Sequence, residues 1–458
     1  MASYSEIASG WCASLAYEDI PPDVMGITKH LILNSIAVGM AAAMTGKYGA
    51  IVKSASAGQE GPCHVIGTTT KTTPTAAALA NGLLISALGY DDSLPETLVH
   101  VAGSVFSCAL AIAETRKITG REFLVSVAAG NELVCRIGLV APLQFHKSGL
   151  HPSGIIGAMG CAYVAARLLG LSEPEMRNAV GIVGNMAAGI NQSWVDGSHA
   201  QFVDSGWAAV SAMTAAILAR SGLDGPPEVL EGRFGLFRSH IQDADTPLDF
   251  NRMIDRLGQH WDCLGIEIKS YPTGHVSLPF VEAMLQLRHT ENLRADQVHK
   301  ITALMAAWMI PVVGEPLEEK RRPSSDLHGK VSIPYTLAET LVHGRLGAGS
   351  YSDRDLQNEE ILALADRTEC LVDSEAPPSD VYKGWVRVEL KDGRVLERIV
   401  LHGKGKQVLS AAQFRSKFSE CLAFAGQSHV ENKIWEAVGN LEHESSVSDL
   451  ADLLGSTH

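Results

Sequence analysis

The segment Phe145-His-Lys-Ser-Gly-Leu-His-Pro-Ser-Gly-Ile-Ile-Gly157 separates two long apolar patterns of helical character. The pattern before it, 123–140, carries few charges, and the pattern after it, 155–169, is rich in alanine and glycine. Pro152 predicts the start of the second helix, because proline lacks only an N–H group that the first turn leaves unpaired. His151 is then expected as the N-cap residue of that helix.

His151 would therefore lie beside a helix N-terminus, whose partial positive charge and free N–H groups favour a bound carboxylate. An imidazole next to such an anion site is suited to proton transfer, since its unperturbed pKa lies near neutrality. The simpler interpretation is that His151 only caps the helix and that Lys147 is a solvated loop charge. The segment alone leaves both interpretations open.

Length and composition predict a globular protein of two domains. At 458 residues the chain is longer than one ordinary core requires. Its hydrophobic share of 46% and charged share of 19% are typical of globular chains, and its many small residues predict closely packed helices. The net charge of −14, without a long basic run, argues against nucleic-acid binding.

Cysteine usage and the chain start predict the compartment. The chain has 8 cysteines without a Cys-x-x-Cys pair, and most lie in apolar helical patterns, which indicates buried thiols in a reducing compartment. The N-terminus lacks the basic start and apolar core of a signal peptide. No apolar run approaches the length of about 20 residues that crosses a bilayer. We therefore expect a soluble, cytoplasmic protein with no membrane partner.

Periodicity predicts helices first and strands later. Helices are expected at 4–18, 22–44, 73–88, 105–115, 121–139, 154–169, 173–189, 205–220 and 227–231, with no strand before about residue 264. A strand at 298–308 and a loop at 310–328 follow, then a hairpin of 381–390 and 394–401 around Asp392-Gly393, and helices return at 410–455. This predicts a mainly α fold: a large all-α helical domain of residues 1–264 and 405–458, with an inserted smaller α+β lid domain of residues 265–404.

Common nucleotide, metal and hydrolase motifs do not occur in the sequence. Neither Gly-x-Gly-x-x-Gly nor Gly-x-x-x-x-Gly-Lys-Ser/Thr is present, and Gly-x-Ser-x-Gly is missing. Asp91 and Asp92 could hold a divalent cation, but adjacent carboxylates at a helix end are more often caps or surface charges. The motifs therefore favour neither a nucleotide site nor a metal site.

Several stretches together resemble the 2-methylcitrate dehydratase family, also called MmgE/PrpD. They are Gly89-Tyr-Asp-Asp-Ser93, His100-Val-Ala-Gly-Ser104, Leu150-His-Pro-Ser-Gly154, Ala165-Ala-Arg-Leu-Leu-Gly-Leu171, Gly222-Leu-Asp-Gly-Pro226, Glu231-Gly-Arg-Phe-Gly235, Ile268-Lys-Ser-Tyr-Pro272 and Val331-Ser-Ile-Pro-Tyr335. Their order and spacing extend the similarity over nearly the whole chain. The family includes 2-methylcitrate dehydratase, cis-aconitate decarboxylase and iminodisuccinate epimerase.

The resemblance implies a large helical domain, a smaller α+β lid, a homodimer, and no metal or organic cofactor. It also implies chemistry at the carbon next to a carboxylate in a small di- or tricarboxylate. We expect His151 and His100 to be the acid and base, and Lys269 to bind carboxylate and offset developing charge. Asp91 and Ser93 are expected to orient a histidine or a substrate hydroxyl. The expected substrate-binding residues are His275, Lys147, Gln201 and Tyr271.

Several positions depart from the family pattern, among them Ser93 in place of a threonine and His275, which is offset by one residue. Gly89 replaces the first acid of an Asp-Phe-Asp-Asp segment, Gln201 lies near a position usually held by lysine, and Asp204 replaces a nearby histidine. The joint loss of positive and acidic groups indicates a substrate different from that of the decarboxylase. We expect a dehydratase of a 2-methylcitrate-like hydroxyacid. A decarboxylase, an epimerase and a non-catalytic carboxylate-binding homologue are the alternatives.

Two expectations concern how the parts of the protein meet. Helices 154–169 and 205–220 carry almost no charge on any face, so their own domain or a partner must bury them. We expect a homodimer, the commonest closed oligomer, with a large-cored monomer as the alternative. Lys269 begins the smaller unit, whereas His151 belongs to the larger one. We expect both to face one cleft between the domains, although Lys269 could instead end a strand at the surface.

Overall fold

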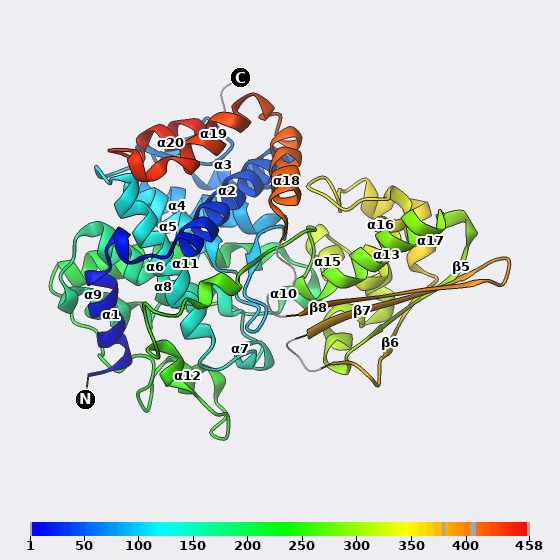
Figure 1. The fold of residues 1–458 in the computed structure, drawn as a ribbon, viewed down its shortest axis with the longest axis horizontal. Coiled ribbons are helices and arrows are strands. Elements are labelled where there is room, and N and C mark those ends of the chain that lie inside the picture. Colours follow the sequence, from blue (N-terminus) through cyan, green and yellow to red (C-terminus); the bar gives the residue numbers. More distant parts are fainter. Residues whose placement is uncertain (1, 378–380, 404–408, 456–458) are drawn as a thin grey trace.

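Two separate hydrophobic cores organise the chain in the computed structural model, which describes residues 2–377, 381–403 and 409–455. The larger core takes nearly all its side chains from 8–268 and 414–454, and the smaller core takes its side chains from 276–390. Figure 1 shows the C-terminal helices returning to the N-terminal part of the chain, away from the long strands. Helices predominate in the described residues, so the predicted mainly α fold is confirmed.

The larger core is enclosed by α-helices from both ends of the chain. They are α1 (Tyr4–Ser14), α2 (Pro22–Met44), α3 (Gly46–Ala55), α4 (Pro74–Ala87), α5 (Ala102–Ala113), α6 (Gly120–Gly138), α7 (Gln144–Lys147), α8 (Pro152–Leu169), α9 (Glu173–Val183), α10 (Ser193–Asp196), α11 (Val203–Arg220), α12 (Leu236–Ile241), α18 (Ala411–Phe424), α19 (Glu431–Gly439) and α20 (Ser448–Leu454). Prolines begin α2, α4 and α8, where the missing N–H donor costs nothing. The chain returns to this core at its C-terminal end, where α18 packs against α2.

Small residues let the central helices approach closely, as their abundance predicts. α4 and α11 meet at Gly82 and Gly206, where a Cβ atom added to Gly82 would overlap the backbone of Gly206. α6 and α8 meet at Gly160, where an added Cβ atom would overlap the side chain of Val134. Because protein interiors are close-packed, a larger residue at either contact would have to push two helices apart.

The expectation that no apolar run approaches membrane-spanning length was wrong. In the part of the chain that the structure describes, 3 helices are long and apolar enough to cross a bilayer, by length and composition alone: Pro22–Met44, Pro152–Leu169 and His199–Arg220. However, 78%, 89% and 61% of their respective apolar windows are buried inside the protein. The fold itself therefore covers much of the apolar surface of these helices, and least of it in the third.

The smaller core packs beside a four-stranded sheet of order β6-β5-β7-β8. The strands are β5 (Val298–Met305), β6 (Thr368–Val372), β7 (Val381–Leu390) and β8 (Val395–Gly403), and the helices are α13 (Leu278–Glu291), α14 (Leu317–Arg321), α15 (Asp326–Lys330), α16 (Ile333–His343) and α17 (Glu359–Ala365). β6 runs parallel to β5 and the other pairs are antiparallel. α13 packs against β7 and β8. The predicted strand and hairpin are confirmed, whereas β6, whose last two residues are exposed, was missed.

Several local predictions were wrong. The first 260 residues are not all-α, because β1 (Cys63–His64) pairs with β2 (Lys71–Thr72), and β3 (Asp92–Ser93) pairs with β4 (Glu267–Ile268). Strands of two residues are too short to show alternation. The segment 227–231 forms turns, since so short a run cannot offset the cost of starting a helix. The expected loop 310–328 holds α14 and the start of α15. The predicted domain boundary at 404/405 lies outside the described residues.

Candidate active site

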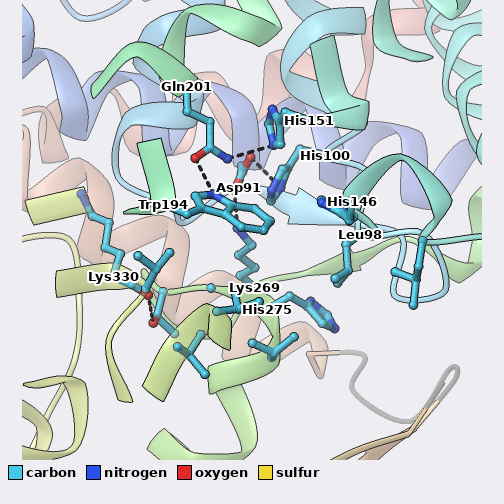
Figure 2. A pocket seen from close by; sticks show the side chains of 18 of the residues that line it. Asp91, Leu98, His100, His146, His151, Trp194, Gln201, Lys269, His275 and Lys330 are labelled. Carbon is cyan, nitrogen blue, oxygen red and sulfur yellow. Dashed lines mark hydrogen bonds and ion pairs between the residues drawn. The ribbon is translucent and has the colours of Figure 1, made fainter. Parts of the chain in front are cut away.

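A cavity of about 880 Å³ lies between the two cores and takes wall residues from both. Most of the residues singled out from the sequence line it: Asp91, His100, Lys147, His151, Gln201, Lys269 and His275. Figure 2 shows all of these groups except Lys147, converging from several elements. Lys269 and His151 thus face one cavity, as expected of a shared site. Ser93 and Tyr271 lie outside its lining.

Two helix starts bring His100 and His151 together. His151 is the N-cap residue of α8, as predicted. The carboxylate of Asp92 accepts hydrogen bonds from the two backbone N–H groups at the start of α5, at 3.0 and 3.1 Å, which confirms the expected capping role for one acid of the pair. The backbone N–H of His100 donates to Ser153 Oγ at 2.9 Å, and this bond ties α5 to α8. The imidazole centroids of His100 and His151 lie 5.8 Å apart.

A chain of hydrogen bonds fixes the position of the proton on His151. The indole N–H of Trp194 donates to Gln201 Oε1 at 2.6 Å. An indole only donates, so the amide NH₂ of Gln201 must face the imidazole. That amide donates to His151 Nε2 at 2.9 Å, and His151 Nδ1 donates to Asp204 Oδ2 at 2.7 Å. His151 is therefore neutral, with its proton on Nδ1 and a lone pair on Nε2.

Burial supports the same protonation state. It lowers the pKa of His151, while the hydrogen bond and charge of Asp204 partly oppose this effect. A neutral imidazole whose Nε2 lone pair lies at a cavity wall can accept a proton from a bound molecule. Gln201 occupies that lone pair in this structure. A ligand must therefore replace the amide of Gln201 before His151 acts as a base.

Lys269 meets Asp91 because β3 pairs with β4. The register Asp92↔Ile268 places the flanking residues side by side, and Lys269 Nζ donates to Asp91 Oδ1 at 2.8 Å. His100 Nδ1 lies 3.2 Å from Asp91 Oδ2. Burial opposes the charge on Asp91, but His100 and Lys269 outweigh it and hold the pKa of this carboxyl below its usual range. Lys269 is 3% exposed, so the alternative that it ends a strand at the surface is wrong.

The other acid of the pair and a distant lysine complete this buried region. Burial and the charge of Asp91 raise the pKa of Asp92 to about 7, against its hydrogen bonds from the start of α5. The amine of Lys417, on α18, donates to the carbonyl oxygens of Tyr90 and Lys269 at 2.7 and 2.8 Å. Burial lowers the pKa of Lys417 to about 7. α18 thus holds the backbone that presents Asp91 and Lys269.

Ser93 and His275 join the two parts of the molecule. Ser93 Oγ lies 2.7 Å from His275 Nδ1, and the ring centroid of His275 lies 5.2 Å from that of Tyr382. Burial lowers the pKa of His275 well below its ordinary value, so this imidazole is neutral. Ser93 orients a histidine that lines the cavity, although its role in a reaction stays a prediction. Tyr271 packs against the smaller core instead, and its predicted contact with substrate also stays a prediction.

Further lining residues were not assigned a role from the sequence. His146 stacks on Trp194 with ring centroids 5.3 Å apart, and burial lowers the pKa of His146 to about 3. Lys330 is buried, and its Nζ donates to Asp326 Oδ2 at 2.6 Å. His146 belongs to the same segment as His151, which was a usable signal. The sequence signal for Lys330 was weaker: this residue directly precedes the Val331-Ser-Ile-Pro-Tyr335 stretch.

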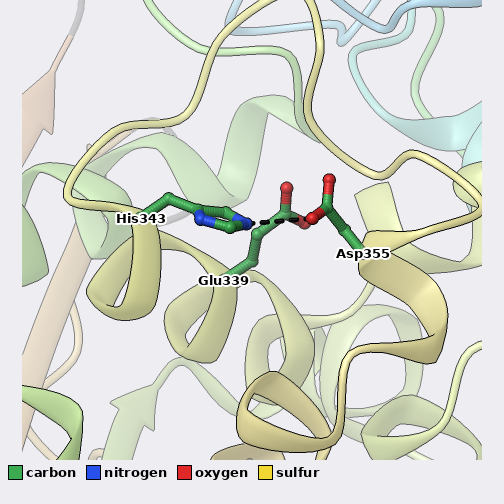
Figure 3. A group of neighbouring side chains, drawn as sticks. All are labelled: Glu339, His343 and Asp355. Atoms are coloured by element: carbon green, nitrogen blue, oxygen red, sulfur yellow. Dashed lines mark hydrogen bonds and ion pairs between the residues drawn. The ribbon is translucent and has the colours of Figure 1, made fainter.

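Within the described residues, one group of side chains has the composition of a metal site. One ligand atom each from Glu339, His343 and Asp355 lies within 4.8 Å of the others (Figure 3). The group belongs to α16 and the segment after it, and its members do not contribute to the cavity lining. His343 Nε2 already lies 3.0 Å from Asp355 Oδ1, at hydrogen-bond distance. We assign this group no part in the chemistry of the cavity.

Comparison with protein-family models gives two matches that together span most of the chain. The MmgE/PrpD N-terminal domain model matches residues 6–249, and the MmgE/PrpD C-terminal domain model matches residues 271–443. The interval between the two matches contains β4 and Lys269.

Comparison with known proteins gives relatives of two activities. A cis-aconitate decarboxylase of Aspergillus terreus is 29% identical over 474 residues, which cover 97% of this chain and 94% of the relative. The cis-aconitate decarboxylase-like protein oryM of Aspergillus oryzae is 27% identical over 97% of this chain and 95% of its own. A 2-methylcitrate dehydratase of Cupriavidus necator is 26% identical over 74% of this chain and 72% of its own.

Proposed function

Because the chain belongs to the MmgE/PrpD family, we propose that it is a lyase acting next to a carboxylate of a small di- or tricarboxylate. Within that class we propose dehydration of a 2-methylcitrate-like hydroxyacid. The observation that carries this proposal is the Nε2 lone pair of His151 in the same cavity as the ammonium group of Lys269. Removing a proton next to a carboxylate requires a base and a positive group near the developing charge.

The proposed reaction moves one proton and one hydroxyl group. His151 Nε2 takes the proton from the carbon next to the carboxylate, and the electrons of that C–H bond form the new C=C bond. The C–O bond breaks, and the hydroxyl group leaves as water after taking a proton from His100. Lys269 stabilises the charge that accumulates on the carboxylate. Asp204 stabilises the imidazolium that forms on His151.

The orientation of His100 supports its role as the acid. His100 Nδ1 lies 2.7 Å from the backbone oxygen of Asp92, which can only accept a hydrogen bond. Nδ1 therefore carries a proton, and Nε2 is the ring nitrogen left to face a substrate. The nearby carboxylate of Asp91 stabilises positive charge on this ring. An imidazolium at this position would be paired with that carboxylate, and the imidazolium is the form that releases a proton.

Decarboxylation is the second candidate. The relatives named for that activity match 97% of this chain, whereas the dehydratase of Cupriavidus necator matches 74%. The same two histidines would exchange protons at a carbon next to the carboxylate that leaves as carbon dioxide. The greater coverage shows that this chain resembles the decarboxylases over more of its length. It does not indicate whether a C–O bond or a C–C bond breaks.

A substrate panel separates the two reactions. We expect the purified protein to remove water from 2-methylcitrate, followed by the ultraviolet absorbance of the new double bond, without release of carbon dioxide. Release of carbon dioxide from cis-aconitate would instead favour the second candidate. Failure to convert citrate, 2-methylcitrate, cis-aconitate or iminodisuccinate would contradict both proposals.

A variant tests the base directly. His151→Ala should lower kcat by about 10²–10⁴-fold, the usual contribution of a general base, with little change in the thermal midpoint. His289→Ala, on the exposed surface of α13, is the matched control and should retain wild-type turnover. A fully active His151→Ala variant would contradict the assignment of His151 as the base.

A further inference from the structure

The cavity is large and has an apolar wall. Its volume of about 880 Å³ lies near the upper end of the ~300–1,000 Å³ of small-molecule sites. Besides the polar groups around His151 and Lys269, the lining includes a set of apolar side chains: Leu98, Leu139, Leu143, Val276, Trp308, Val312 and Val313. In Figure 2, Leu98 lies beside His146, on the opposite side of the view from Lys330. A small acid bound at His151 would leave much of this wall uncovered.

The buried charges of the cavity are already balanced. Lys269 pairs with Asp91, and Lys330 pairs with Asp326. The remaining lining cations are at the surface: Lys147 is exposed, and the side chain of Arg252 is 42% exposed. Such cations are screened by water and attract an anion weakly. Away from Lys269 and Lys330, the cavity wall therefore attracts an anion weakly and suits the hydrocarbon part of a ligand.

Two of the apolar residues in the cavity wall have an unfavourable backbone conformation. Leu98 has φ 55° and Leu143 has φ 62°, and both line the cavity. The left-handed region is unfavourable for leucine, because its Cβ crowds the carbonyl oxygen. Strained residues persist where the surrounding fold holds them, and they cluster at ligand sites. Two strained leucines in one cavity wall indicate that their apolar side chains are needed there.

From the apolar lining, the paired charges and the two strained leucines, we propose that the substrate carries a hydrocarbon substituent longer than a methyl group beside its carboxylates. The substituent packs against Leu98, Leu143, Trp308 and Val312. Trp308 is 37% exposed, so a ligand can still cover it. This inference rests on the proposed function, because it places the carboxylate end of the same molecule at His151 and Lys269.

A homologous series of 2-alkyl hydroxyacids, with methyl, ethyl and butyl substituents, tests the inference by calorimetric binding and by turnover. Each added methylene should lower Kd by about three- to fourfold until the wall is covered. A Kd that is constant or rises with chain length overturns the inference, whether or not the methyl compound is converted. A Kd that falls with chain length without turnover supports the inference and contradicts the proposed function. Absence of both binding and turnover for the whole series overturns both.

Variants locate the substituent. Leu143→Asn removes the apolar group at a position whose left-handed backbone and N-cap place asparagine accepts readily. It should lower the butyl-over-methyl affinity ratio by at least about fivefold, which corresponds to the loss of more than one buried methylene. Leu223→Asn, 47% exposed and outside the lining, is the matched control and should keep the ratio. Trp308→Gln repeats the test at an unstrained position. Wild-type ratios in both Leu143→Asn and Trp308→Gln would overturn the inference.

Discussion

The indole N–H of Trp194 controls His151 without touching its acidic partner. It fixes the amide of Gln201, and that amide leaves only Nδ1 to carry the imidazole proton toward Asp204. The same amide covers the lone pair that catalysis needs. The protonation of His151 Nε2 therefore depends on the side chains of Trp194, Gln201 and Asp204. Changing the charge of one of these neighbours should change that protonation.

Gln201→Glu should reverse the protonation of His151 Nε2. The carboxylate would still accept from Trp194, but it would require a proton on Nε2 and would raise the pKa of His151 by about 1–3 units. The acid limb of the kcat/KM profile should move upward by the same amount, because the base is lost below the new pKa. The matched control is Gln144→Glu, the same change at another lining glutamine. An unmoved acid limb in Gln201→Glu would show that His151 is not the base.

Glu339 should make stability depend on pH. Burial raises the pKa of Glu339 from its ordinary 4.5 to about 7, so the folded protein keeps a proton there that the unfolded chain loses. The free energy of unfolding should therefore fall as pH rises from about 4.5 to 7, by up to about 3 kcal/mol for this group. Glu339→Gln should remove that fall in urea unfolding measured across this range.

The control for this prediction is Glu359→Gln, which changes an exposed carboxylate at the start of α17. It should leave the slope of stability against pH as in the wild type. A Glu339→Gln variant with the wild-type slope would contradict the raised pKa.

At the scale of elements, α11 shows how glycine sets the distance between helices. Gly206 meets α4, where an added Cβ atom would overlap the carbonyl oxygen of Leu79. In α2, by contrast, an added Cβ atom on Gly26 would meet nothing within 4 Å. The same chemical change should therefore have opposite effects in the two helices.

Gly206→Ala should destabilise the protein by about 1–3 kcal/mol, because α4 and α11 must separate to admit the methyl group. Gly26→Ala should stabilise it by about 0.5–1 kcal/mol, because alanine favours the helix and the space is open. Scanning calorimetry of both variants measures the difference. Equal thermal midpoints would contradict the close contact between α4 and α11.

At the scale of the whole molecule, the cavity depends on two cores held in one arrangement. Asp91 and Lys269 flank the paired strands β3 and β4, which are separated in sequence by the helices α5 to α12. Lys417, on α18, supports the backbone at both places. The division into residues 1–264 with 405–458 and residues 265–404 stays a proposal, although the two cores follow a similar division. Losing α18 would remove a support of the site without removing a lining residue.

The apolar surface of α11 favours a homodimer. Val203, Trp207, Ile217 and Leu218 on this helix are between 38% and 44% exposed. Light scattering should give about twice the chain mass of 48.9 kDa at micromolar concentration. Ile217→Glu should shift the protein toward monomer, because a charge would be buried at the interface. Ile51→Glu, on α3 and 41% exposed, is the control. A monomer mass for the wild type would refute the dimer.

Local signals in the sequence determined where several elements begin and turn. Pro152 placed the start of α8 and His151 at its N-cap, and Asp392-Gly393 placed the turn between β7 and β8. Such signals act through the conformational preferences of a few neighbouring residues, so they can be recognised in the sequence alone. The order of several short motifs was enough to indicate the family and the mainly α fold. The sequence also singled out about half of the polar residues of the cavity wall.

Only the tertiary structure decided how those residues are paired. Asp204 becomes the partner of His151, and Asp91 the partner of Lys269, through contacts that no local pattern specifies. β3 and β4 are too short to be recognised, and they pair only because the packed cores offset the entropy of closing the long loop between them. The charge and tautomer of each catalytic candidate depend on these neighbours, because burial and nearby charges set a pKa. The sequence could therefore indicate which residues belong to the site, whereas their protonation states required the tertiary structure.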